Sequence, residues 1–420
     1  MYPKTFLVAL MFALGSSAVS KELSLNEAMQ LAKLHNGTVA AAKKNYESAQ
    51  SAVRGAGAAF FPEIFPEYRY SNNKLNGTGT QEFDQFSIGA NWLLLDGGQR
   101  QFTLQRSKRL ADANKFSTLW TLRQVLFNVT RQYYEVLRAR ELKKVADSQV
   151  VRTNEILEVV KGRVAEGVAA RKEILQAEAD AANAIVDQIT ATNQVNTSEA
   201  AMKATIGWQS SEPLPDLIPP PQEIGPRRDW TLLQAVETGT QKRPDLEEAR
   251  QRLKADRFNV LTAKRNASFD WTLNFSYSRN FEPNDTSNRS LTFLLSYPLF
   301  DAGRTKEQLN QSKLSYESGE LLLEQQVRDA RSEIESVFLT WDQNRSRLEA
   351  SEKALKAAKL NYEAAAGSQA EGVSNILDVT NARVSLVTAE TNYVRAIYDY
   401  YVADSQLRLV VGEPIEGEQE

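Results

Sequence analysis

Apolar and polar residues alternate in four segments of this chain, which come as two widely separated pairs. In the segment 290–300, Leu291, Phe293 and Leu295 are separated mainly by polar residues. A period of two with aromatic residues is typical of β-strands that have one apolar face. We therefore predict strands at about 64–74, 83–95, 271–281 and 290–300. The segments 71–85 and 278–290, rich in Asn, Gly, Thr and Asp, are expected to form the loops between paired strands.

Helical segments surround these strands. Short helices are predicted at 25–35 and 232–242, each ended by a breaking dipeptide and followed by a second helix that leads to the first strand of a pair. Two long stretches after the strands, 101–163 and 305–366, contain no proline. In 305–366 the apolar residues recur at steps of three, four and seven, which is the heptad pattern of a coiled coil. A helix of this size is roughly 95 Å long.

The whole pattern occurs twice. Asp96 and Asp301 lie 205 residues apart, in Leu-Leu-Asp-Gly-Gly and Leu-Phe-Asp-Ala-Gly. A spacing of 205 also relates Gly167 to Gly372 and Gly207 to Gly412, and a spacing of 207 relates Leu25 to Leu232 and Tyr70 to Tyr277. Such a repeat is far too long for a solenoid. The chain is therefore one large unit in two copies, which we place at 21–212 and 230–412.

Three further segments flank the copies. Residues 1–20 contain Lys4, an apolar stretch and the small-residue ending Ala18-Val19-Ser20, which is the pattern of an export signal peptide. The segment 213–229 is rich in proline and is predicted to be an extended linker. The tail 413–420 is acidic and is expected to be disordered.

Composition and charge exclude several classes of function. With no cysteine and one histidine, His35, the chain can form neither a disulfide nor a metal site of His and Cys ligands. A formal net charge of −3 argues against a nucleic-acid partner. No serine can be matched with a histidine–acid pair. We therefore predict no enzyme activity, no cofactor and no metal.

Exported strands with an aromatic face suggest an outer-membrane β-barrel. Four strands are too few, because closed barrels begin at about eight strands. The chain should therefore oligomerise, and strand number alone does not decide between two and three copies. A protein of another class also fits the pattern, namely a periplasmic coiled-coil scaffold or adaptor with a small soluble sheet.

The sequence resembles the TolC family of outer-membrane efflux proteins over residues 23–412. The most specific marks are the strand ends at 93–98 and 298–303, together with Gly167-x5-Glu173 and Gly372-x5-Asp378. The resemblance implies a mixed, mainly α-helical fold. It implies a homotrimer in which four strands per chain build a transmembrane β-barrel, mounted on a barrel of long antiparallel coiled-coil helices. It further implies an exit duct for efflux or type I secretion in outer-membrane lipid, with a periplasmic adaptor (membrane fusion protein) and an inner-membrane transporter as partners.

The resemblance also assigns roles at the two helical tips near residues 167 and 372. Asp378, Asn381 and Glu173 would line the periplasmic aperture, where facing acids attract cations. Asp378 would alternatively stabilise the start of its own helix. Asn381 stands where the family often has a second acid, and Ser374 where a basic residue is common. The adaptor would contact the tips at Gly167, Val168, Ala169, Ala170, Arg171, Gly372, Val373, Ser374 and Asn375.

Overall fold

The computed structural model describes residues 22–75, 79–209, 211–221, 230–371, 376–415 and 418. These residues form two compact units, which are 22–32 with 129–221, and 33–128 with the described residues from 230 onward. The export signal predicted at 1–20 lies outside the described residues. Across the described ranges, none of the helices is both long enough and apolar enough to cross a membrane.

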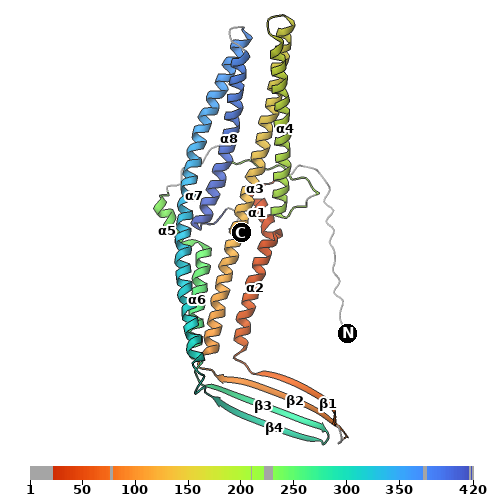
Figure 1. Cartoon of the computed structure of the whole chain (residues 1–420), viewed down its shortest axis with the longest axis vertical. Helices are drawn as coiled ribbons and strands as arrows, with labels where there is room; N and C mark the ends of the chain where they lie inside the picture. The colour runs from red at the N-terminus through yellow and green to blue at the C-terminus, as the bar shows by residue number, and fades with distance from the viewer. Residues whose placement is uncertain are drawn as a thin grey trace. The chain divides into compact units, whose positions relative to one another are not determined.

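The helices and strands follow the same order twice. The first copy contains α1 (Leu25–His35), α2 (Gly37–Ala58), β1 (Glu63–Leu75), β2 (Gly79–Leu95), α3 (Gln99–Ala165) and α4 (Arg171–Ile206). The second copy contains α5 (Leu232–Lys242), α6 (Pro244–Arg265), β3 (Asp270–Glu282), β4 (Thr286–Ser296), α7 (Arg304–Ala370) and α8 (Ile376–Val411). The predicted mixed, mainly α-helical fold with an internal duplication is confirmed (Figure 1).

Local sequence signals set several helix ends. At the start of α2, the side chain of Asn36 accepts hydrogen bonds from the backbone N–H groups of Thr38 and Val39, a role in which asparagine is favoured. Pro244 occupies the first position of α6. A backbone N–H at this position has no acceptor within the helix, so its absence in proline costs no helical hydrogen bond. Gly412 follows α8 with a φ of +74°. This left-handed conformation ends a helix and favours glycine.

In the first unit, α4 packs on the part of α3 that follows Asn128. The buried face of α4 contains the small residues Ala177, Ala181 and Ala184, which allow close approach of the two helices. At its other end the guanidinium of Arg140 on α3 pairs with the carboxylate of Glu199 on α4 at 2.7 Å. The alanine contacts near one end and the ion pair near the other hold the two helices of this hairpin together.

The N-terminal segment and the start of the proline-rich linker meet in the same unit. Leu23 and Leu217 form a parallel β-bridge. The hydroxyl of Tyr133 lies 2.9 and 2.8 Å from the carbonyl oxygens of Leu23 and Ile218. Burial of this ring raises the pKa of Tyr133 to about 12. The described part of the linker is therefore anchored as an extended segment.

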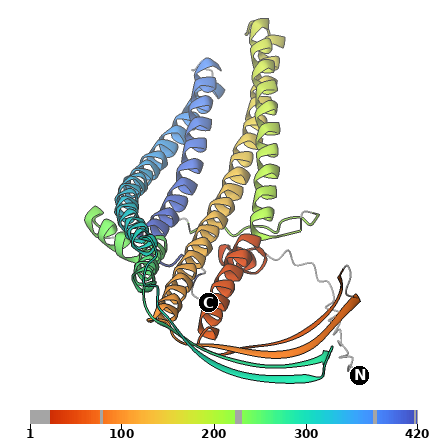
Figure 2. The same ribbon diagram turned by 60° about the horizontal axis from the view of Figure 1, so that its bottom comes forward.

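The second unit holds the sheet, whose strands are antiparallel in the order β1-β2-β3-β4. The inner pair β2–β3 joins the two copies, with Ile88 opposite Tyr277 and Ala90 opposite Phe275. Each edge strand, β1 and β4, has one partner strand in the chain. Figures 1 and 2 show the sheet beside the C-terminal ends of α2 and α6 and the N-terminal ends of α3 and α7.

One face of the sheet is apolar across all four strands. Tyr68 lies opposite Phe86 in the pair β1–β2, and Leu273 lies opposite Phe293 in the pair β3–β4. Residues one step away, such as Ser87 on β2, belong to the other face, because successive side chains of a strand alternate. The alternation in the sequence thus identified one apolar and one polar face.

The far ends of both hairpins differ from the prediction. β1 and β3 end within one residue of the predicted 74 and 281, but β2 begins at Gly79 and β4 at Thr286, so the loops expected at 71–85 and 278–290 are much shorter. In the second hairpin only 283–285 separate the two strands. These ends carry polar residues on both faces, so the alternation that reveals a strand is missing although backbone pairing continues.

The helix-proximal end of β4 also differs. A strand was predicted to 300, whereas β4 spans Thr286–Ser296. Its partner β3 begins at Asp270, which lies opposite Ser296, so the residues after Ser296 have no partner strand among the described residues. Pro298 also lacks the N–H that a strand residue donates. Apolar and polar residues thus continue to alternate up to residue 300, although the residues after Ser296 do not form a strand.

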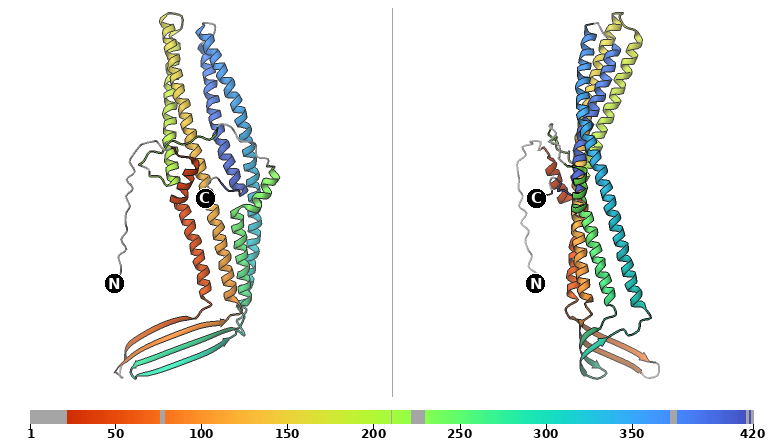
Figure 3. Two further views of the ribbon diagram at one scale, coloured as in Figure 1. Left: turned by 180° about the vertical axis from the view of Figure 1, so that it is seen from behind. Right: turned by 90° about the vertical axis from the view of Figure 1, so that its left-hand side faces the viewer.

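The predicted heptad positions of α7 are its buried face. Ile334 and Trp341 are fully buried, and Ala330 and Leu348 are buried as well. Figure 3 shows α8 lying alongside α7, and its residues such as Leu407 complete this core. The coiled-coil prediction for this helix is confirmed by the burial of these positions.

The acidic tail is partly folded, which contradicts the expectation of disorder. Ile415 is buried. The carboxylate of Glu418 accepts three hydrogen bonds of 2.9 to 3.1 Å from the guanidinium of Arg123 on α3. Arg123 also donates to the carbonyl oxygen of Gly412 at 2.9 Å. Arg123 is buried, and a buried charge requires a partner, so its contact with Glu418 holds the tail in place. The composition of the tail gives no sign of this distant partner.

Candidate functional site

The tip between α3 and α4 is a glycine turn. Gly167 has a φ of +77°, a conformation that other residues adopt only with strain. The backbone N–H of Val168 donates to the carbonyl oxygen of Arg163 at 2.9 Å, which closes the end of α3. The side chain of Val168 is 64% exposed, and Arg171 is also exposed. The tip therefore presents an apolar and a cationic side chain to its surroundings.

Glu173 has a structural partner at this tip. Its Oε1 accepts a hydrogen bond of 3.3 Å from the backbone N–H of Ala170. Glu173 lies in the first turn of α4, where an acid satisfies a free N–H and is stabilised by the helix dipole. The structure thus gives Glu173 a capping role, and its place at an aperture stays a prediction.

The second tip is described from Ile376 onward, and the predicted contact residues Gly372, Val373, Ser374 and Asn375 lie outside the described residues. Asp378 lies in the first turn of α8. Asp378 and Asn381 are both exposed, and their spacing of one turn places them on one face of the helix. A second molecule on that side of α8 would therefore meet a carboxylate and an amide together.

The duplicated aspartates connect the strands to the long helices. Asp96 Oδ2 accepts the backbone N–H of Arg100 at 2.8 Å, and Asp301 Oδ2 accepts that of Thr305 at 2.9 Å. Both carboxylates satisfy N–H groups that a helix start leaves free. The hydrogen bonds from the side chain and backbone of Thr305 lower the pKa of Asp301. The repeated motif is thus a helix start and not a catalytic site.

The two equivalent turns leave different amounts of room. Gly97 has a φ of +63°, and a Cβ built on it would lie 2.1 Å from Ser268 Oγ. At the equivalent position Ala302 has a φ of +54° and carries a methyl group. The first turn adjoins the segment that enters β3, whereas the second lies at the edge of the sheet.

Arg100 ties the first hairpin to its helices, although it was not singled out in the sequence. Its Nε donates to Asp96 at 3.0 Å, and its terminal nitrogens donate to the carbonyl oxygens of Ala59 and Leu94. Its guanidinium lies 5.0 Å from the ring centroid of Phe60. The acid and the base four residues apart at a helix start are a sequence signal from which this contact could have been predicted.

A chain that repeats an aromatic strand hairpin joined to a long helical hairpin has the architecture of an outer-membrane channel protein. The family described as "Outer membrane efflux protein" matches residues 28–208 and 236–413. Because these ranges cover most of the chain, the protein belongs to the outer membrane efflux protein family. The resemblance drawn from the sequence is confirmed.

Two known relatives and a solved structure match most of the chain. The outer membrane protein TolC of Vibrio cholerae is 25% identical over 421 residues, covering 95% of this chain and 93% of the relative. The outer membrane efflux protein BepC of Brucella suis is 23% identical over 405 residues, covering 95% and 87%. The crystal structure of the outer membrane protein VceC from Vibrio cholerae matches with a TM-score of 0.78 at 18% identity, covering 93% of this chain and 96% of that one. The likeness to VceC shows the fold.

Family membership decides between the classes that the sequence left open. The chain is a passive outer-membrane exit channel that extends into the periplasm, and it is not an enzyme. The alternative of a periplasmic scaffold is set aside. The aperture and adaptor-contact residues remain predictions.

Proposed function

We propose that three copies of this chain form one duct across the outer membrane and the periplasm, through which cargo leaves passively. The supporting observation is a fold with two open strand edges and an exposed apolar stripe, which neighbouring copies would cover. An inner-membrane transporter would supply energy and cargo, through a periplasmic adaptor docked on the helical tips. Efflux, the activity named in BepC, and type I secretion both suit such a duct.

The exposed stripe lies on α7. Leu314, Leu321 and Leu339 are 61 to 66% exposed. At 100° per residue they fall on the side of the helix opposite the buried Trp341. A row of exposed leucines along one helix face marks a surface that another molecule covers. In a ring of copies, α7 would face its own core on one side and a neighbour on the other.

The internal duplication supplies a register for the strands at the proposed seam. Within the chain, Ala90 on β2 lies opposite Phe275 on β3. The equivalent of Ala90 at a spacing of 205 is Leu295 on β4, and the equivalent of Phe275 at a spacing of 207 is Tyr68 on β1. If the seam between copies repeats the one within the chain, Leu295 of one copy pairs with Tyr68 of the next.

A cysteine pair at these positions is expected to link neighbouring copies. The natural chain has no cysteine. The two thiols of the double variant Leu295→Cys/Tyr68→Cys can therefore form a disulfide only with each other or with the same thiols of another copy. Opposed residues on antiparallel strands have Cβ atoms about 5 Å apart, within reach of a disulfide. Mild oxidation should give covalent dimers and trimers on a denaturing gel.

The matched control for this cross-link is Leu295→Cys with Asn72→Cys. Asn72 lies four residues further along β1, roughly 13 Å from Tyr68. This control should remain monomeric on the same gel. Equal linkage in both variants would contradict the register. Absence of linkage in both variants, with protein that sediments as a monomer, would contradict the assembly.

Asp378 is expected to set the charge preference of the duct. In planar bilayers the wild-type protein should give discrete steps that favour cations, and Asp378→Asn should reduce the cation-to-anion permeability ratio by roughly sevenfold for each kT of potential removed, because the potential acts on both ions in opposite directions. The reverse change is Asn381→Asp, which adds an acid one turn away and should raise the ratio. An unchanged ratio in both variants would remove these residues from the aperture. Wild-type protein that gives no steps would contradict the duct.

A further inference from the structure

Basic residues are concentrated where the helices of the second unit meet the sheet. We call this region the basic collar and define it as residues 49–62, 96–109, 256–269 and 297–314. These segments contain 11 Lys and Arg against 4 Asp and Glu, in a chain whose net charge is −3. The collar therefore carries a net charge of +7, and the remainder of the chain carries −10.

The opposite ends of the long helices lack this bias. Residues 156–180 and 361–385, which surround the two tips, contain 5 Lys and Arg against 8 Asp and Glu. The long helices are thus basic beside the sheet and acidic at the tips. A general excess of basic residues on helix surfaces does not explain this difference, so the position beside the sheet has its own electrostatic requirement.

The acids inside the collar do little to neutralise it. Asp96 pairs with the guanidinium of Arg100 at 3.0 Å and so neutralises one base, whereas Asp301 accepts backbone N–H groups of its own turn. Among the bases, Lys108 is exposed, and within the described residues no hydrogen bond or ion pair involves its amine. The pair Arg109–Asp112 spans 3.5 Å between side chains that are 40 and 49% exposed. Arg100 is therefore committed to contacts within the chain, whereas Lys108 and Arg109 can meet an external anion.

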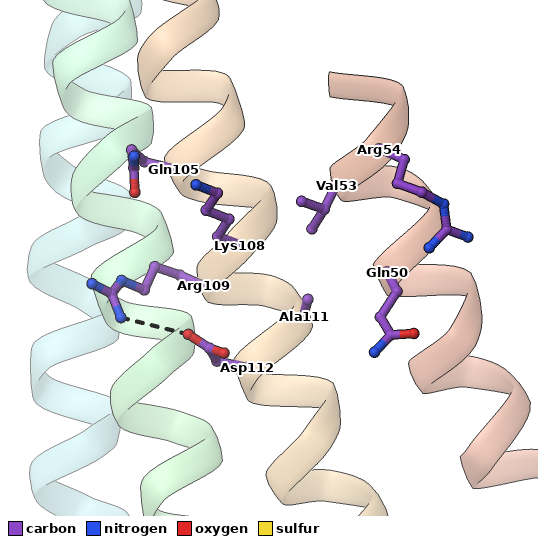
Figure 4. Close-up of a pocket in the computed structure, with 8 residues that line it drawn as sticks. All are labelled: Gln50, Val53, Arg54, Gln105, Lys108, Arg109, Ala111 and Asp112. Atoms are coloured by element: carbon purple, nitrogen blue, oxygen red, sulfur yellow. Dashed lines mark hydrogen bonds and ion pairs between the residues drawn. The ribbon is translucent and has the colours of Figure 1, made fainter. Parts of the chain in front are cut away.

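A groove between α2 and α3 lies at the border of the collar, with Asp112 just outside it (Figure 4). Its volume is about 540 Å³, and its polar lining consists of Gln50, Arg54, Gln105, Lys108, Arg109 and Asp112. Figure 4 shows that Arg54 extends from α2 away from α3, whereas Lys108 and Arg109 extend from α3 away from α2. The three cations point apart, so they are unsuited to chelating one phosphate ion. They suit a layer of many anionic groups.

Aromatic residues lie at the ends of the collar segments that adjoin the strands. Phe61 and Phe300 are 73 and 87% exposed. Phe269 stacks on Tyr297 with ring centroids 4.5 Å apart. Aromatic residues at the ends of membrane strands mark the level of the lipid headgroups. The basic residues of the collar lie on the helix side of these aromatic residues, which places their long side chains within reach of headgroup phosphates.

We propose that the basic collar binds the phosphate groups of anionic phospholipids in the leaflet that faces the periplasm. The proposal rests on the outer-membrane position of this channel. Each Lys or Arg close to an anionic membrane surface strengthens binding by about fivefold. The collar would thus hold the channel at a fixed depth and gather anionic lipid around it.

The test compares two triple variants of the full-length protein in neutral detergent. The collar variant is Arg54→Gln/Lys108→Gln/Arg109→Gln. The matched control is Lys353→Gln/Lys356→Gln/Lys359→Gln, which removes the same charge from exposed positions on α7, roughly 70 Å from the start of that helix. Dioctanoylphosphatidylglycerol is titrated into each protein, and bound lipid is counted by native mass spectrometry.

Wild-type and control proteins should bind the anionic lipid with the same affinity, and the collar variant should bind at least about tenfold more weakly, given about fivefold per residue. Dioctanoylphosphatidylcholine should bind all three proteins weakly. Equal binding of both lipids, an unchanged affinity in the collar variant, or displacement of the lipid by an equal concentration of inorganic phosphate would each overturn the proposal.

A bilayer recording of the same proteins separates this result from the proposed duct. Collar-variant protein that conducts like wild type but has lost lipid affinity supports both inferences. Collar-variant protein that conducts and keeps its lipid affinity overturns the collar alone. Melting temperatures within a few degrees of one another would show that all three proteins are folded.

Discussion

Replacing Gly412 with alanine is expected to lower the free energy of unfolding by about 2–5 kcal/mol. Gly412 has a φ of +74°, and a Cβ there would lie 2.8 Å from the backbone carbon of Lys242 and 2.9 Å from the nitrogen of Arg243. A side chain thus meets both a strained conformation and the backbone at the junction of α5 and α6. Urea unfolding of detergent-purified protein, followed by its helical circular dichroism, measures the loss.

The matched control is Gly303→Ala. Gly303 has a similar φ of +85°, but among the described residues no neighbouring atom lies within 4 Å of the position that its Cβ would occupy. This variant should therefore lose only the conformational part, about 1–2 kcal/mol. Equal losses in the two variants would show that the contact of Gly412 with the junction is unimportant.

Replacing Glu418 with alanine is expected to cost about 3–5 kcal/mol, the usual effect of leaving a buried charge without its partner. The side chain of Arg123 is 8% exposed and that of Glu418 is 13% exposed. Without the carboxylate, the guanidinium keeps only the carbonyl oxygen of Gly412 as an acceptor among the described residues. The same unfolding measurement applies, and the described tail should become sensitive to carboxypeptidase.

A surface pair provides the comparison for Glu418. Glu158 contacts Lys161 on α3, but both side chains are largely exposed, so Glu158→Ala should leave stability unchanged within error. The double variant Arg123→Met/Glu418→Ala removes both buried charges and should recover much of the loss. If Glu418→Ala behaves like Glu158→Ala, the ion pair does not hold the tail.

The helices and the sheet core were predictable because each rests on local physics. The boundary at Asn36 follows from a side chain that caps the next residues, and the heptads of α7 follow from the periodic burial of Ile334 and Trp341. The starts of β2 and β4 were not predictable, because a strand with two polar faces has no alternation. Pairing there depends on the neighbouring strand, which a local window does not contain.

The candidate site was only partly accessible to the same reasoning. The turn at Gly167 could be placed because a left-handed residue between two helices favours glycine. The contact between Arg123 and Glu418 could not, since its partners are 295 residues apart and neither spacing nor periodicity relates them. Duplication was the long-range signal available in the sequence, and it relates equivalent residues rather than touching ones.

The equivalent turns at Gly97 and Ala302 differ because the two hairpins have different neighbours in the chain. Joined on one polypeptide, the first hairpin gained a permanent neighbour, and Ser268 now fills the space a methyl group would need. The second hairpin kept an open border, and alanine is accommodated there. Contacts within one chain therefore exclude a side chain at Gly97, whereas in the proposed ring the surroundings of Ala302 would come from a neighbouring copy.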